Sequence, residues 1–349
     1  MRREEYGGYL PFETRVGEDY FSRYGEAHIL RTNSGKAAIY YALKAAKPRK
    51  VYAPHYLCDS VRRMLADSGI EVEQFYLDEE MLPRLWKVEK GAAVLLVNYY
   101  GVMEEQVRKA AGQFSSVIID NAHAFFAEPI LRESVWNVYS CRKFVGVPDG
   151  GYLVSASLPG ALTPGTSQTG TLLSEALTPG ASMVDASGVH LEPDCVSAHF
   201  SYLTTSMEYG MNAAYQEKQD ADRYFYGNYA GMSRISRSML STADYAYIRE
   251  KREENYSRLH EKLKDVNQLK LPDTVPAWLY PFWPGERGAD LRKELVAEKI
   301  YTPTLWRELI RPDFEGTLEY RLSREVIFLP VDQRYDCVDM EELAGRVTG

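Results

Sequence analysis

The 349-residue sequence lacks the features that mark several common classes of protein. Its four cysteines (Cys58, Cys141, Cys195 and Cys337) are scattered and include no Cys-x-x-Cys pair, so neither a zinc knuckle nor a disulfide framework is predicted. The six histidines are equally dispersed, and we predict no metal site. A reducing cytoplasm is therefore the expected location of the protein.

Long apolar runs and an excess of positive charge are also absent. No run approaches the roughly 18 apolar residues that span a bilayer, and none follows the charged amino terminus, so we predict no membrane association. The 41 basic and 49 acidic residues give a net charge of -8, which does not favour binding to nucleic acid. No Gly-x-Gly-x-x-Gly follows the first strand, which disfavours a dinucleotide-binding dehydrogenase.

Short apolar runs alternate with helical patterns over the first half of the chain. Strands are predicted at residues 50–54, 71–77, 92–97, 117–120 and 135–139 and after Gly151. Helices are predicted at 59–68 and 104–114, and another is predicted to begin at a cap formed by Thr32, Asn33 or Ser34. This alternation predicts an α/β fold, with a mostly parallel sheet and helices on both of its faces.

The chain is long enough for two domains. We predict a large domain over residues 1–245, with an aromatic amino-terminal arm at 1–30 that packs on it or on a partner subunit, and an irregular segment at 155–193. The remaining residues, 246–349, are expected to form a linking helix and a small carboxyl-terminal α+β domain. The charged residues of the linking helix, Arg252 among them, are expected on its solvated side.

Two neighbouring strands deliver an acid and an amine to one edge of the predicted sheet. An apolar run leads into Asp120, and the next strand leads through Ser140 to Lys143. Ligands bind at the carboxyl ends of such strands. A lysine can form an imine with an aldehyde cofactor, and a buried carboxylate can keep a pyridine nitrogen protonated, as in pyridoxal-phosphate chemistry. Taken alone, however, the pair fits an exposed, salt-bridged lysine better.

Three motifs resemble landmarks of the fold type I pyridoxal-phosphate enzymes: Asp120-Asn121-Ala122-His123, Ser140-Cys141-Arg142-Lys143 and Asp149-Gly150-Gly151. Their order and spacing are most similar to those of the DegT/DnrJ/EryC1/StrS family of sugar aminotransferases, over most of the chain. The serine-to-lysine interval is shorter than in the family and lacks its histidine, and Pro148-Asp149 replaces a Gly-Glu pair. These departures concern the substrate more than the cofactor.

The resemblance implies a role for each member of the site. Lys143 would bind pyridoxal 5'-phosphate and move the proton, Asp120 would hold the ring nitrogen protonated, and His123 would contact the ring or its phenolic oxygen. The phosphate would be bound by Ser34, Gly35, Lys36 and Ser140. Without the resemblance, residues 34–36 are only the start of a well-capped helix.

Two further cofactor contacts are predicted with alternatives. An aromatic side chain after the strand at 50–54 would stack on the pyridine ring; Tyr56 is the first choice and His55 the second, while a core tyrosine is an equal alternative. Asn228 would reach the cofactor phosphate of the opposite subunit of a homodimer, or else lie in a glycine-flanked turn. Trp306, Arg307 and Arg321 are possible substrate contacts by location alone.

The family resemblance implies transfer of an amino group from glutamate to a keto sugar carried on a nucleoside diphosphate. One alternative is a catalytically silent dimer with a binding or regulatory role, and another is a pyridoxal-phosphate enzyme of a different reaction type. The presence of both Asp120 and Lys143 counts against the silent alternative. Family members that dehydrate sugars have histidine at the position of Lys143, so the lysine favours transamination.

Overall fold

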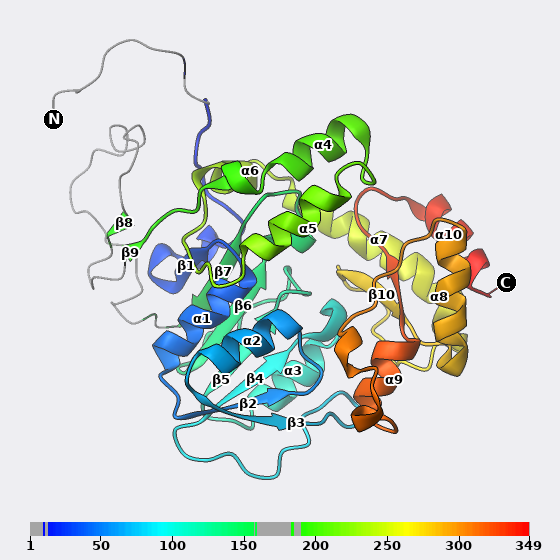
Figure 1. Cartoon of the computed structure of the whole chain (residues 1–349), viewed down its shortest axis with the longest axis horizontal. Helices are drawn as coiled ribbons and strands as arrows, with labels where there is room; N and C mark the ends of the chain where they lie inside the picture. Colours follow the sequence, from blue (N-terminus) through cyan, green and yellow to red (C-terminus); the bar gives the residue numbers. More distant parts are fainter. Residues whose placement is uncertain (1–9, 11–12, 157, 159–182, 185–189, 349) are drawn as a thin grey trace.

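A computed structural model describes residues 10, 13–156, 158, 183–184 and 190–348. Its central element is a seven-stranded sheet with the spatial order β1-β7-β6-β5-β4-β2-β3 (Figure 1). The strands are β1 (Ile29–Thr32), β2 (Lys50–Pro54), β3 (Glu71–Phe75), β4 (Ala93–Val97), β5 (Val117–Asn121), β6 (Val135–Ser140) and β7 (Gly151–Ser155). Within this sheet β7 runs antiparallel to both of its neighbours, and the other adjacent pairs are parallel. The predicted α/β class is confirmed.

Position in the sheet explains the composition of its strands. Every residue of β4 and β5 is buried, because both strands lie in the middle of the sheet with other elements on both faces. The edge strand β3 instead exposes Glu71, Glu73 and Gln74. Charged side chains on an edge strand disfavour pairing with another chain. The strands predicted in the first half of the chain match the observed ones closely.

Helix α1 (Gly35–Ala46) packs across β5, β6, β7 and β1. It begins at Ser34, whose side chain accepts a hydrogen bond from the Ala37 amide over 3.1 Å. The start of the helix lies against β7, because a Cβ on Gly151 would be 2.4 Å from the carbonyl carbon of Ser34. Gly151 pairs with Ser140 across the sheet. The first turn of α1 is therefore held at the carboxyl end of β6.

In the described part of the chain before residue 245, the other α-helices are α2 (Asp59–Asp67), α3 (Glu104–Ala111), α4 (Ser201–Tyr209), α5 (Tyr215–Tyr224) and α6 (Arg234–Ser241). A two-stranded pair joins β8 (Met183–Val184) to β9 (His190–Leu191). Most of the irregular segment predicted at 155–193 lies outside the described residues.

The predicted amino-terminal arm is partly described. Phe21 is fully buried and packs against Phe125, Tyr139 and Tyr152, as expected for an arm that packs on the sheet. The prediction that the arm extends to residue 30 is wrong at its end, because β1 begins at Ile29. A four-residue strand that contains an arginine is too short to show an apolar period, and it forms through pairing with β7.

From residue 245 onward, the α-helices and strands of the described chain are α7 (Tyr245–Leu263), β10 (Leu279–Phe282), α8 (Gly288–Ala297), α9 (Leu318–Glu325), β11 (Ile327–Pro330) and α10 (Cys337–Thr348). Strands β10 and β11 form an antiparallel pair. Figure 1 shows these elements gathered beside the seven-stranded sheet, with α7 leading from one part to the other. The hydrophobic core continues from the large sheet into these elements, and a domain boundary at residue 245 stays a prediction.

One prediction about α7 is wrong. Arg252 does not lie on the solvated side of the helix; it is only 2% exposed. The reason is its spacing, four residues after Ile248 and four before Tyr256, which places it on the buried face of the helix.

Three features are absent from the described part of the chain: a membrane-spanning helix, a disulfide bond and a metal-binding cluster. No helix there is long and apolar enough to cross a membrane. All four cysteines are unpaired. The described residues contain no group of three or more His, Cys, Asp or Glu side chains placed to hold a metal ion.

Candidate functional site

Asp120 lies near the carboxyl end of β5 and is 7% exposed. Its Oδ1 atom accepts a hydrogen bond from the Ala122 amide over 2.9 Å, while Oδ2 receives no hydrogen bond from the residues that the structure describes. Burial raises the pKa of Asp120; the Ala122 amide and the charge of Lys143 act in the opposite direction. A cationic partner at Oδ2 would restore the ionised form.

Lys143 is the last residue of a short 3-10 turn, Cys141–Lys143, that directly follows β6. Its amine makes no ion pair or hydrogen bond with any described residue, and lies 4.3 Å from the centre of the Trp278 ring. Burial lowers the pKa of Lys143, although the charges of Cys58 and Asp120 act in the opposite direction. A lysine with a lowered pKa is more often neutral and therefore a better nucleophile and base.

The structure therefore brings Asp120 and Lys143 together at one edge of the sheet, close enough for each charge to act on the other. The alternative of an exposed, salt-bridged lysine does not fit, because Lys143 is only partly exposed and has no carboxylate within ion-pair distance in the described part of the chain.

His123 lies in the same place and is surrounded by aromatic side chains. Its Nδ1 accepts a hydrogen bond from the Tyr100 amide over 3.2 Å, which leaves the proton of the neutral ring on Nε2. Burial, followed by the charge of Lys143, lowers the pKa of His123 well below its usual value. The ring lies 4.3 Å from that of Trp278 and 6.0 Å from that of Trp306. His123 is therefore a neutral side chain that is held in one orientation beside Lys143.

The first turn of α1 lies next to the turn that carries Lys143. A Cβ on Gly35 would come within 3.3 Å of the Ser140 Cβ, so the helix start and the end of β6 are in close approach. The free amides and the positive dipole end of a helix start favour an anion such as a phosphate. The Lys36 amine lies 4.3 Å from the Tyr226 ring centre. Burial lowers the pKa of Lys36, with Cys58 acting oppositely and Arg142 adding to the effect.

Asn228 lies beside this turn in its own chain. Its carbonyl oxygen accepts a hydrogen bond from Asn33 Nδ2 over 3.3 Å, and the same amide group donates to Asp194 over 2.9 Å. The segment that holds Asn228 is thus fixed next to Ser34. A contribution of Asn228 to the site of a second subunit stays a prediction.

The structure does not bring Tyr56 or His55 to Lys143. The Tyr56 ring is fully buried against Tyr99, Tyr100 and Trp306, and its hydroxyl is 2.6 Å from that of Tyr100. Trp306 lies between Tyr56 and His123 in this series of contacts. The stacking of Tyr56 on a cofactor stays a prediction.

His55 and two of the predicted substrate contacts, Arg307 and Arg321, also show no contact with Lys143 in the described part of the chain. The His55 ring lies beside Tyr76 and Phe314 instead. Among the possible substrate contacts, Arg321 pairs with Glu79 at 3.0 Å and Arg307 is exposed.

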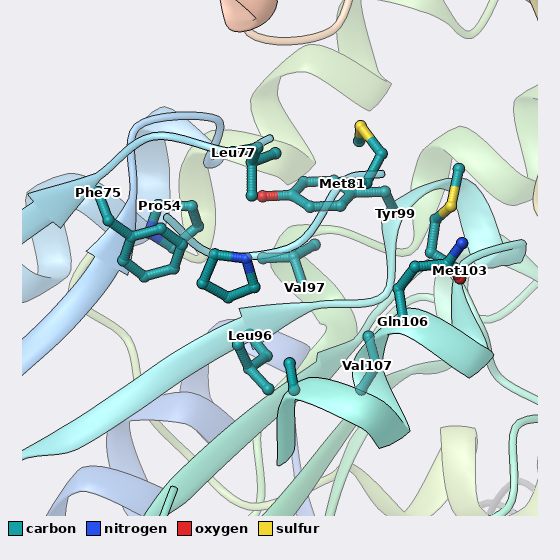
Figure 2. Close-up of a pocket in the computed structure, with 12 residues that line it drawn as sticks. Pro54, Phe75, Leu77, Met81, Leu96, Val97, Tyr99, Met103, Gln106 and Val107 are labelled. Carbon is teal, nitrogen blue, oxygen red and sulfur yellow. The ribbon is translucent and has the colours of Figure 1, made fainter. Parts of the chain in front are cut away.

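A small cavity lies between α3 and the carboxyl ends of β2, β3 and β4 (Figure 2). Most of the side chains around it are apolar: Pro54, Phe75, Leu77, Met81, Pro83, Leu96, Val97, Tyr99, Met103, Gln106, Val107 and Ala110. Its volume of about 10 Å³ has room for one water molecule at most. This cavity is therefore a packing gap in the core and is distinct from the site around Lys143.

Sequence reasoning missed two residues that shape the site, Trp278 and Arg252. Trp278 precedes β10 in a segment without a motif, and no sequence signal pointed to it. Arg252 could have been found as a charge on the apolar stripe of α7.

The chain is similar in structure, but not closely in sequence, to several solved proteins. No family model matches the chain, and no curated protein matches its sequence. Among solved structures, DesV of S. venezuelae has a TM-score of 0.57 and 18% identity, over 94% of this chain and 86% of that one. A DegT DnrJ EryC1 StrS aminotransferase from Brucella abortus has a TM-score of 0.57 and 16% identity, over 94% and 87%.

A third solved structure, sugar aminotransferase CalS13 from Micromonospora echinospora, has a TM-score of 0.57 and 14% identity, over 94% of this chain and 88% of that one. The chain therefore has the fold of the fold type I transferases, with its elements present over nearly the whole length.

Proposed function

We propose that the chain is a pyridoxal-phosphate-dependent aminotransferase. The observation that carries this proposal is the pairing of buried Asp120 with the unpartnered amine of Lys143 at the carboxyl edge of the sheet. The same edge holds the helix start of α1, where an anion is favoured. The proteins with the same fold are named as aminotransferases, which supports the same chemistry here.

The residues fit the cofactor. Ser34, Gly35, Lys36 and Ser140 would hold its phosphate, since Gly35 and Gly151 leave open the close approach between the helix start and the sheet. Asp120 Oδ2 would accept a hydrogen bond from the pyridine nitrogen, and His123 would lie beside the ring. When bound, pyridoxal phosphate supplies an aldehyde that links to an amine and a ring that withdraws electrons from an adjacent carbanion.

The chain's own groups would hold and move protons. Asp120 alone is biased towards its neutral form, because burial raises its pKa, but a protonated ring nitrogen opposite it favours the carboxylate. Their charge-assisted hydrogen bond is of a class worth about 1.5–3 kcal/mol. Burial lowers the pKa of Lys143, which favours the neutral amine that can take up and return a proton. The Trp278 ring, 4.3 Å from the amine, keeps water away from that side of it.

For the substrates, we propose glutamate as amino donor and a nucleotide-linked keto sugar as acceptor. The structure of DesI, at a TM-score of 0.55 and 14% identity, is described with its TDP-sugar product, which supports this acceptor class. We also propose a homodimer in which Asn228 contributes to the site of the partner. A cytoplasmic location remains our prediction.

One observation favours a second candidate, a silent protein with a binding or regulatory role. The Trp278 ring lies directly against the Lys143 amine, where it covers the group that would have to meet the cofactor aldehyde. In that case the amine would not react with pyridoxal phosphate. A pyridoxal-phosphate enzyme of another reaction type is the remaining alternative, and it shares the same cofactor site.

Reductive trapping distinguishes the two candidates. The protein is mixed with pyridoxal phosphate, treated with borohydride and digested, and the peptides are analysed by mass spectrometry. The proposal predicts the added mass on Lys143 in wild type and its loss in Lys143→Ala. Added mass on Lys36 alone, or at the level of exposed lysines such as Lys293, would contradict it.

A further inference from the structure

Arg252 is a buried cation that holds backbone carbonyls together. From α7, its Nη1 donates to the carbonyl oxygens of Ala277 over 3.0 Å and of Trp278 over 3.2 Å. Its Nη2 donates to the carbonyl oxygen of Lys143 over 3.2 Å. One guanidinium therefore joins the backbone of the lysine turn to the backbone of the segment whose indole covers that lysine.

The surroundings of Arg252 contain no carboxylate within ion-pair distance among the described residues. Asp332 is the acid whose charge acts on it most. Burial lowers the pKa of Arg252 to about 10, which reflects the cost of holding this charge away from water. The carbonyl bonds and the Phe144 ring, 4.5 Å from the guanidinium carbon, offset that cost.

A second donor reaches the same turn from the carboxyl-terminal part of the chain. Gln333 Nε2 donates to the carbonyl oxygen of Phe144, the residue after Lys143, over 2.9 Å. Asn255, one turn after Arg252 on α7, donates to the carbonyl oxygens of Val331, Asp332 and Tyr335 and so holds the loop that carries Gln333. Arg252 and Gln333, both held by α7, thus donate hydrogen bonds to two consecutive carbonyl oxygens, those of Lys143 and Phe144.

We propose that Arg252, assisted by Gln333, is a positioning residue that fixes the Lys143 turn against the Trp278 segment. It sets where the Lys143 amine lies relative to the indole and to Asp120. Its catalytic meaning rests on the proposed function, since the amine that it positions is the one that would bind the cofactor. Arg252 reaches Lys143 and Trp278 through their backbone carbonyls only, and it makes no contact with Asp120 among the described residues.

The test measures the Lys143 amine in the cofactor-free protein. Acetylation of each lysine by a small anhydride is followed across a range of pH by peptide mass spectrometry, and the midpoint of each profile is determined. The Lys143 amine contacts the Trp278 ring and interacts electrostatically with His123, Cys58, Asp120, Arg142 and Asp222, and all of these are unchanged in the variants. Exposed Lys293 in the same samples serves as the internal reference.

In wild type the Lys143 midpoint is expected below that of Lys293, because burial lowers its pKa. In Arg252→Met the turn is released, the amine reaches water, and its midpoint rises towards the reference by about one pH unit, a shift typical of a change in environment. Arg249→Met is the matched control, since Arg249 lies on the exposed side of α7 in an ion pair with Glu253. Its Lys143 midpoint should not change.

An Arg252→Met protein that folds, melts at a lower temperature and keeps the wild-type Lys143 midpoint would overturn the proposal, because Arg252 would then be structural only. If Arg252→Met does not fold, Gln333→Leu decides: a raised midpoint supports the proposal and an unchanged midpoint overturns it. The measurement uses no cofactor. A shifted midpoint together with no trapping of the cofactor on wild-type Lys143 would therefore refute the proposed function and leave the positioning role intact.

Discussion

The Lys143 amine lies 4.3 Å from the centre of the Trp278 ring, although the two residues come from opposite halves of the chain. A cation over an indole face gains about 0.5–2 kcal/mol, so the ring holds the amine without a carboxylate. The same ring lies 4.3 Å from that of His123. The candidate site is therefore completed by the segment before β10, and not by the strand ends of the sheet alone.

The Asp120 carboxylate is expected to act on chemistry more than on binding. Asp120→Asn keeps the shape of the side chain but cannot neutralise a protonated ring nitrogen. We predict that the variant binds pyridoxal phosphate yet transaminates roughly 10- to 100-fold more slowly, the effect of losing one charge-assisted hydrogen bond. Cofactor titration and steady-state rates with the same keto acceptor would check this. An undiminished rate would remove Asp120 from its assigned role.

The close approach at Gly151 gives a steric test of the phosphate site. A Cβ there would lie 2.5 Å from the carbonyl oxygen of Ser34 and 2.7 Å from the amide nitrogen of Gly35, so the start of α1 must move in Gly151→Ala. We predict a loss of about 1–3 kcal/mol in the free energy of unfolding. Cofactor affinity, measured by titration of the folded variant, should also fall.

Gly146→Ala is the matched control for this variant. Gly146 lies on the same connection between β6 and β7, is exposed, and would have no atom within 4 Å of an added Cβ. Its free energy of unfolding should stay within about 0.5 kcal/mol of wild type, as is usual for surface changes. Equal cofactor affinity in the two variants would show that the helix start does not bind the phosphate.

Asp149 should make stability depend on pH. Its carboxylate accepts hydrogen bonds from the Ser233 amide over 2.8 Å, the Ser233 hydroxyl over 2.7 Å and the Ser236 hydroxyl. Burial nevertheless raises the pKa of Asp149 to about 6. The folded state then holds a proton that the unfolded state, with a pKa of about 3.9, has lost. The resulting stabilisation is complete below about pH 4 and disappears as pH rises through about 6.

Asp149→Asn isolates this contribution. We predict that the free energy of unfolding of wild type, relative to the variant, falls by up to about 3 kcal/mol between pH 4 and pH 7, the equivalent of a two-unit pKa shift. Urea unfolding of both proteins at a series of pH values would measure it. A difference that stays constant with pH, or grows, would show that the hydrogen bonds outweigh burial and keep Asp149 ionised.

Local patterns in the sequence predicted much of the fold. Apolar runs located β4, β5 and β6, since these central strands are buried on both faces. The possible caps Thr32, Asn33 and Ser34 located the start of α1 to within two residues, and the structure shows Ser34 as the cap. The strand ends then placed Asp120 and Lys143 at one edge. β1 is different because its formation depends on pairing with β7, a contact that its own four residues do not encode.

Long-range contacts account for the rest of the site. The role of Trp278 depends on how the segment before β10 packs against the lysine turn, and nothing in its neighbouring residues indicates this. The burial of Arg252 could be inferred from its position on the apolar stripe of α7, but its carbonyl partners could not. The prediction for Tyr56 rests on its place after β2, whereas its surroundings depend on Trp306, which comes much later in the chain.

The most direct test of the account is a visible spectrum of the purified protein with pyridoxal phosphate, followed by the addition of glutamate. We predict an absorbance band from cofactor bound to Lys143, absent in Lys143→Ala, that converts to the pyridoxamine form when glutamate is added. A band that persists in Lys143→Ala would place the link on another lysine. The absence of any band in wild type would contradict the account and favour a silent protein.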